Sequence, residues 1–183
     1  MHLPVPRVPQ QPASRRPEIQ LGRLTAELAT VVAGARRRAL RDGDRQIDTA
    51  HLLHSLIESD PEVGAAFAGG PPQLARLLGY LVQRSIGYGL RWRASVEDSG
   101  ALEVVRDTVA AEATAAGWSP TAAAAMDGAW ERAALRGDPR ARGLDLLAVI
   151  AADPESRAVE VLRRAGVDPR VLTDRIGELS QQV

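Results

Sequence analysis

The chain has 183 residues, of which 45% are hydrophobic and only 3% aromatic, so its core must be built from Leu, Val, Ile and Ala. Its 23 basic and 23 acidic residues leave no net charge, and so no general attraction to nucleic acid or anionic membranes. There is no cysteine, and every basic residue is arginine. This composition excludes disulfides, thiolate chemistry, a P-loop lysine and Schiff-base catalysis.

The N-terminal segment lacks an apolar stretch typical of a secretory signal, and no apolar run approaches the roughly 20 residues of a membrane span. We therefore expect a cytoplasmic protein. Five of the 12 prolines fall within residues 1–20, where they remove backbone donors and hold the chain extended. This composition predicts a mostly disordered, Pro-rich tail over residues 1–20.

Helix start and stop signals recur after this tail. Thr25 is a candidate N-cap and Gly43 a candidate end for the first helix. Asp48 starts the next helix, Asp60-Pro61-Glu62 a third, and Pro71-Pro72 a fourth. Apolar residues at helical spacing predict the buried sides of these helices: Leu28, Val31, Val32, Ala35, Ala39; Leu52, Leu53, Leu56, Ile57; Leu74, Leu77, Leu78, Leu81, Val82.

The second half shows similar signals. A helix is expected over 99–116, after an irregular stretch that contains Trp92. Ser119-Pro120 starts a long helix that ends near Gly137, and Leu144, Leu146, Leu147, Val149 and Ile150 mark a short apolar helix. Asp153-Pro154-Glu155 repeats the earlier start signal, and Asp168-Pro169 starts the last helix. No segment has a convincing strand pattern.

The two halves resemble each other along their length. Leu52 and Leu53 match Leu146 and Leu147, and Asp60-Pro61 matches Asp153-Pro154. The sequence therefore predicts an all-α fold of two pseudo-symmetric four-helix repeats with an extra linking helix. The expected organisation is a tail at 1–20, repeat one at 21–89, a linker with its helix at 90–117 and repeat two at 118–183.

The first repeat also resembles a known family. Leu24-Thr25, Gly43, the stretch Ile47-Asp48-Thr49-Ala50-His51-Leu52-Leu53 and Ile86-Gly87-Tyr88-Gly89 are similar to the N-terminal domain of Clp-type unfoldases, such as ClpA and ClpC. Trp118-Ser119-Pro120 is similar to the start of the family's second repeat. The resemblance spans roughly residues 21–183.

This resemblance implies a non-catalytic module of the Clp protease system, here without the ATPase modules. The implied partners are a Clp unfoldase, its substrates, or apolar and cyclic peptides. The chain would act as an adaptor, regulator or decoy. We expect a monomer with no cofactor, no metal site, no nucleic-acid partner and no membrane contact. The alternatives are a helical nucleic-acid-binding regulator and an enzyme with an unrecognised site.

The resemblance also implies partner- or ligand-binding residues, namely Leu21, Leu24, Thr25, Trp118 and Ser119. Helix capping by Thr25 and Ser119, and core packing of Leu21 and Trp118, are the competing interpretations. Some relatives bind phosphoarginine through a glutamate in each repeat. Ala50 and Leu144 stand at those positions here, so we do not expect that activity.

Two further groups of residues are less specific. His51 and His54 are three residues apart on an expected helix, but no third metal ligand is evident, so packing and capping are the preferred interpretation. Arg36-Arg37-Arg38 spreads around a helical turn near acidic residues, as expected for a solvated face. Trp92 is interpreted either as a partner contact or as a cover over the junction between the repeats.

Overall fold

We analysed a computed structural model that describes residues 22–85 and 117–182. These residues form eight helices and no strand, which confirms the all-helical prediction. The first set comprises α2 (Ala26–Asp42), α3 (Thr49–Ser59), α4 (Pro61–Ala65) and α5 (Gly70–Ser85). The second set comprises α8 (Pro120–Leu135), α9 (Gly143–Ala152), α10 (Arg157–Arg164) and α11 (Pro169–Gln181).

The expected start and stop signals produce most of these helix ends. The Thr25 side chain accepts a hydrogen bond at the start of α2, and Gly43 ends α2 with a φ of 72°. Ser119 caps α8 in the same way, and Gly137 follows α8 with a φ of 79°. Left-handed backbone of this kind favours glycine because glycine has no Cβ. Each repeat therefore starts with a capped long helix and a glycine turn.

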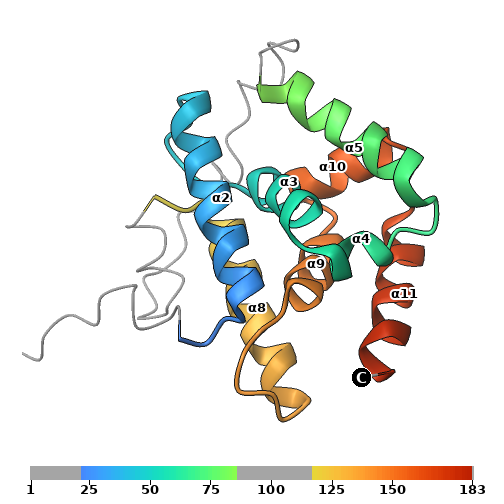
Figure 1. Ribbon diagram of the computed structural model, residues 1–183. Helices are drawn as coiled ribbons and strands as arrows, with labels where there is room; N and C mark the ends of the chain where they lie inside the picture. Colours follow the sequence, from blue (N-terminus) through green and yellow to red (C-terminus); the bar gives the residue numbers. More distant parts are fainter. Residues whose placement is uncertain (1–21, 86–116, 183) are drawn as a thin grey trace, which may run out of the picture.

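Packing follows the apolar pattern of the helices. All five residues predicted for the buried side of α2 lie in the core. In α3, Leu52, Leu53 and Leu56 are fully buried, and Leu144, Leu146 and Leu147 are fully buried in α9. Each buried Leu contributes about 1.5–3 kcal/mol. The helices α3 and α9 consequently form the centre of the molecule, between α2 and α8 on one side and α5 and α11 on the other (Figure 1).

Close helix crossings recur at equivalent places in the two sets. Gly34 of α2 lies against Ser55 of α3, and a Cβ at Gly34 would overlap the Ser55 hydroxyl. Gly128 of α8 lies against Val149 of α9, where an added Cβ would be 2.9 Å from Cγ1. The pairs Gly34/Gly128 and Ser55/Val149 are each 94 positions apart in the sequence. The same helix pair thus packs through the same small residue in each repeat.

Three predictions at the level of single elements differ from the structure. Helix α5 begins at Gly70, one residue before the predicted proline start. Val82 is 46% exposed rather than buried. Asp153-Pro154-Glu155 forms a turn, and α10 begins only at Arg157 because Ser156 supplies the cap that Asp60 supplies to α4.

Several predictions fall on residues that the structure does not describe. These are the tail at 1–20, Leu21, Ile86-Gly87-Tyr88-Gly89, Trp92 and the helix expected over 99–116. Among the described residues, no helix combines the length and the apolar character that a membrane span requires.

Candidate functional site

Two short backbone bridges join the repeats, and they are reciprocal. Leu24, just before α2, pairs with Ala141, just before α9, and Ile47 pairs with Trp118. Leu24 and Trp118 are equivalent positions of the two repeats, as are Ile47 and Ala141, each pair separated by 94 residues. Exchange of equivalent positions between the two contacts is the signature of a twofold arrangement. The two repeats therefore face each other about an approximate twofold axis.

The hydrogen bonds of these bridges are well formed. The Thr25 N–H donates to the Ala141 carbonyl at 3.0 Å, and the Ala141 N–H donates to the Arg23 carbonyl at 2.8 Å. At the other bridge, the Ile47 N–H donates to the Gly117 carbonyl at 2.8 Å, and the Ser119 N–H donates to the Ile47 carbonyl at 2.9 Å. Each bridge satisfies backbone groups that would otherwise be buried without partners.

The residues predicted to bind a partner lie at these two bridges. Leu24 and Trp118 are 6% and 8% exposed, Ser119 is fully buried, and Thr25 is half-buried. The Thr25 hydroxyl accepts from the Leu28 N–H at 3.3 Å, and the Ser119 hydroxyl accepts from the Ala122 N–H at 3.1 Å. Capping and packing are thus observed roles of these residues, and partner binding through them stays a prediction.

The structure does not gather the four described residues into one patch. Leu24 and Thr25 lie at the N-terminal end of α2, whereas Trp118 pairs with Ile47, which follows its C-terminal end. A helix of the length of α2 spans about 26 Å. The two bridges therefore lie at opposite ends of α2, and different residues surround each of them. Ala50 and Leu144, at the positions of the missing glutamates, are both fully buried.

A polar cluster surrounds the bridge formed by Ile47. Asp48 caps α3 and pairs with Arg84 of α5, and its Oδ2 lies 3.9 Å from Nε of Arg157 in α10. His51 closes the cap, since its Nδ1 accepts from the Asp48 N–H at 3.0 Å and its Nε2 lies 2.9 Å from Oδ2 of Asp44. This cluster connects α3 with α5 of its own repeat and with α10 of the other.

The ionisation of this cluster follows from its contacts. Burial opposes the charged form of Asp48, but the His51 hydrogen bond and the Arg84 charge outweigh it and hold its pKa well below the usual range. Burial likewise opposes protonation of His51, but the hydrogen bond and charge of Asp48 raise its pKa above the ordinary value. Asp48 is therefore a buried carboxylate stabilised by cationic neighbours.

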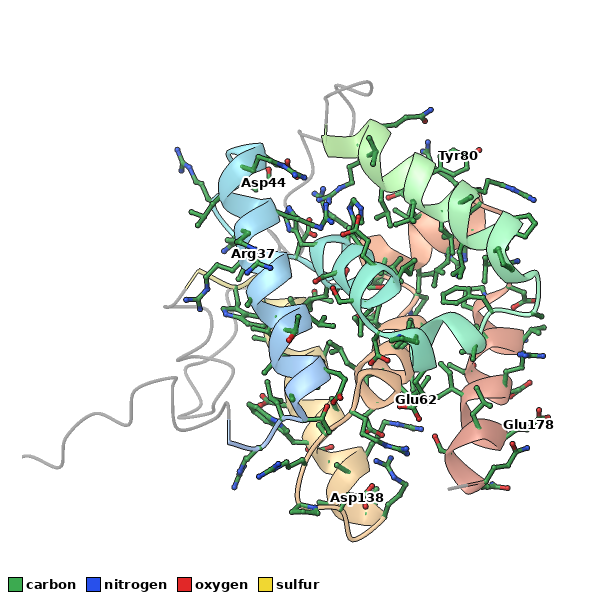
Figure 2. All side chains as sticks on the ribbon, viewed as in Figure 1. Arg37, Asp44, Glu62, Tyr80, Asp138 and Glu178 are labelled. Atoms are coloured by element: carbon green, nitrogen blue, oxygen red, sulfur yellow. The ribbon has the colours of Figure 1, made fainter. Side chains whose placement is uncertain are left out.

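The equivalent cluster of repeat two has different chemistry. Arg136 bonds both Asp138 and Asp145, with its Nη2 2.8 Å from Oδ2 of Asp145. The hydrogen bonds that Arg136 donates, chiefly the one to Asp145, raise the pKa of Arg136. Asp145 also accepts from the Arg142 N–H at 2.9 Å, as His51 does from Asp48. Asp44 and Asp138 occupy equivalent positions at opposite ends of the molecule (Figure 2).

A second ion pair between the repeats has the same polarity as the pair of Asp48 with Arg157. Arg142, the equivalent of Asp48, reaches α4 of repeat one, where its Nη1 lies 3.2 Å from Oε1 of Glu62. In both contacts, repeat one supplies the acid and repeat two supplies the arginine. Paired opposite charges of this kind favour the association of two unlike repeats.

His54 lies in a separate environment. Its Nε2 is 3.2 Å from Oε1 of Glu58, which also pairs with Arg38. Burial and the nearby Arg38 charge lower the pKa of His54 to about 4, so the ring is neutral at neutral pH. His51 and His54 consequently have different partners and do not form a histidine pair. Arg36 and Arg37 are exposed on α2.

Exposed apolar side chains are a feature that sequence reasoning missed. Leu40 near the end of α2 is 74% exposed, and Leu135 at the end of α8 is 88% exposed. Tyr80, Val82 and Val171 are also partly exposed. The helical period could have predicted the exposure of Leu40. Leu40 directly follows the buried Ala39, so it lies outside the buried face of α2.

Comparison with known proteins supports the fold. No protein-family model matches the chain, and no curated protein matches its sequence at a significant level. Among solved structures, the chain is similar to the N-terminal domain of ClpD, a caseinolytic protease-associated chaperone of Arabidopsis thaliana. The TM-score is 0.58 at 18% sequence identity, with 87% of this chain and 95% of that chain covered. This likeness shows that the chain has a fold like that of a Clp N-terminal domain.

Proposed function

We propose that this chain is a non-catalytic protein- or peptide-binding module that works with a Clp-type unfoldase. The observation that supports the proposal is the double-repeat fold, which matches the N-terminal domain of a Clp-associated chaperone over nearly its whole length. The chain has no lysine, which excludes P-loop nucleotide chemistry but does not itself indicate a partner. The proposed role is that of an adaptor, regulator or decoy in the cytoplasm, acting as a monomer.

The main polar clusters are compatible with a binding module. His51 and His54 are both buried, and the side chains that contact their Nε2 atoms are the carboxylates of Asp44 and Glu58. A general base must reach the proton that it removes. These two histidines instead stabilise helix α3 and its surroundings.

The direct test is binding of the full chain to a Clp-type unfoldase and to a labelled apolar peptide, measured by fluorescence anisotropy. We expect saturable binding of at least one of them, with a Kd in the micromolar range or tighter, on the order of −8 kcal/mol. No saturable binding to either probe would contradict the proposal. A duplex DNA probe at low salt tests the nucleic-acid alternative, for which we expect no binding.

Hydrogen exchange on the complex then identifies the contact residues without mutation. The proposed contacts at Leu21, Leu24, Thr25, Trp118 and Ser119 predict slower exchange of amides in 21–28 and 118–122 upon binding. Slower exchange confined to the surroundings of Leu40 and Leu135 would instead assign the contact to the exposed leucines. Either footprint supports a binding module, but only the first supports the five residues.

A further inference from the structure

Three potential metal ligands meet at the C-terminal end of α2. Asp42 is the last residue of the helix, Asp44 follows the glycine turn, and His51 belongs to the first turn of α3. One ligand atom from each lies within 4.8 Å of the others. In Figure 2, Asp44 lies at this end of α2. The two carboxylates and the imidazole form a mixed nitrogen and oxygen ligand set.

Asp48 fixes the orientation of the His51 imidazole through contacts to Nδ1. Its side chain is 3% exposed, and its Nδ1 lies 3.0 Å from both the backbone N and Oδ1 of Asp48. Its Nε2 points toward Asp44, at 2.9 Å from Oδ2. A carboxylate behind one ring nitrogen fixes the orientation of a metal-bound histidine in many sites. Without an ion, Nδ1 accepts from the Asp48 N–H and Nε2 carries the proton of the neutral ring. An ion on Nε2 moves that proton to Nδ1, where Oδ1 of Asp48, 3.0 Å away, accepts it.

The second repeat shows that this position accepts a cation. There, the guanidinium of Arg136 lies between Asp138 and Asp145. Asp44 and His51 occupy the positions of these two aspartates, and Asp42 replaces Arg136. Repeat one thus has a carboxylate, a potential third ligand, where repeat two has the Arg136 guanidinium.

The location adds an electrostatic argument. The C-terminal end of a helix carries partial negative charge, so two carboxylates there raise the free energy unless a cation is near. Asp42 pairs with the neighbouring Arg41, whose Nε lies 3.5 Å from Oδ1, and that arginine side chain is 66% exposed. A solvated partner of this kind screens the charge only weakly.

We propose that Asp42, Asp44 and His51 bind a divalent transition-metal ion of the Zn²⁺ type. Imidazole favours Zn²⁺ over Mg²⁺ and Ca²⁺, which prefer oxygen ligands alone. Ligand atoms about 2 Å from one ion are at most about 4 Å apart. The three ligand atoms lie within 4.8 Å of one another, so small side-chain rotations bring them onto one ion. Water fills the remaining positions. The ion ties the end of α2 to α3 and holds the loop that carries Ile47 to its bridge with Trp118.

The test is isothermal titration of the full, chelator-treated chain with Zn²⁺, together with the change in Tm. We expect one ion per chain at this site, a higher Tm, and no comparable effect of Mg²⁺ or Ca²⁺. Asp44→Asn and Asp42→Asn each weaken binding by about tenfold or more. Asp138→Asn, which changes the equivalent residue of repeat two, and His2→Ala, which removes the histidine of the N-terminal segment, leave the affinity unchanged.

Folding of each variant is checked by its circular dichroism and its Tm without metal. Zn²⁺ binding that is equally strong in Asp42→Asn and Asp44→Asn would overturn the proposal, as would the absence of binding in the unmodified chain. Loss of binding in His2→Ala alone would assign the ion to the N-terminal segment instead. These outcomes are independent of whether the chain binds an unfoldase.

Discussion

At the scale of single residues, the two histidines of α3 show how position determines chemistry. His51 faces Asp44 and Asp48, and its pKa is raised, because the favourable contacts with Asp48 outweigh burial. His54 lies one turn later beside Arg38, and burial together with that positive charge lowers its pKa to about 4. The spacing of the two histidines in the sequence does not predict these opposite pKa shifts. The shifts depend on which charged side chains pack against each ring.

The low pKa of His54 predicts an acid-sensitive fold. The unfolded chain binds a proton at this residue near pH 6.5, whereas the folded chain binds it only near pH 4. Stability contributed by the neutral ring is therefore lost as the pH falls from 6.5 toward 4. Allowing for screening by water, we expect about 1 kcal/mol, or about 2–4 °C in Tm. Thermal unfolding at pH 7 and 4.5 measures this loss.

The control for this effect is His54→Gln, which retains polarity but does not titrate. Its Tm should fall less between pH 7 and 4.5 than that of the unmodified chain. An equal fall in both proteins would assign the acid sensitivity to carboxylates rather than to His54.

At the scale of elements, each repeat depends on a close crossing of its first two helices. Ser55 of α3 donates a 2.7 Å hydrogen bond to the carbonyl of Val31 in α2, and Gly34 leaves room for that hydroxyl. In repeat two, Gly128 and Val149 make the same crossing without the hydrogen bond. The crossing is thus preserved although its chemistry differs between the repeats.

Gly34→Ala is expected to destabilise the chain by about 2 kcal/mol. Its methyl group displaces the Ser55 hydroxyl and leaves buried polar groups without a partner, which exceeds the gain in helix propensity. Gly79→Ala in the exposed face of α5 meets no atom within 4 Å and is the matched control. It should raise stability by up to about 1 kcal/mol. Urea unfolding of both variants measures the difference, and similar values would refute the tight crossing.

At the scale of the whole molecule, an arginine of each repeat donates hydrogen bonds to carbonyls at the C-terminal end of a helix in the other repeat. Arg175 of α11 donates to the carbonyls of Ala66 and Ala65 at the end of α4, at 3.0 and 3.2 Å. Arg76 of α5 donates to the carbonyl of Ala165 at the end of α10, at 3.5 Å. Charged donors at helix C-termini satisfy carbonyls and complement the helix dipole. These contacts add to the two backbone bridges in joining the repeats.

Arg175→Ala is expected to lower the free energy of unfolding by about 1–2 kcal/mol, because it removes two charge-assisted hydrogen bonds. Arg76→Ala should cost less, since its single contact is longer. Arg170→Ala, on the exposed side of α11, is the control and should change stability by less than about 0.5 kcal/mol. Chemical unfolding ranks the three variants. A loss in Arg170→Ala that equals that in Arg175→Ala would contradict the proposed role.

The sequence by itself determined the local structure of this protein. Thr25, Asp48, Ser119 and Asp168 start helices because their side chains accept backbone N–H groups, an interaction within three residues. The apolar period of α2 likewise predicted its buried face, because 3.6-residue spacing alone places those side chains together. The repeat was also visible, since equivalent helices retain equivalent patterns.

Only the tertiary structure decided how the repeats meet and which residues form clusters. Ser156 caps α10, whereas the sequence pattern predicted a start at Asp153. The reciprocal bridges join Leu24 to Ala141 and Ile47 to Trp118, which are 117 and 71 positions apart in the chain. The cluster of Asp42, Asp44 and His51 was within reach in sequence, yet its convergence depends on the glycine turn and on the angle between α2 and α3. Such contacts arise from packing, which local propensity does not encode.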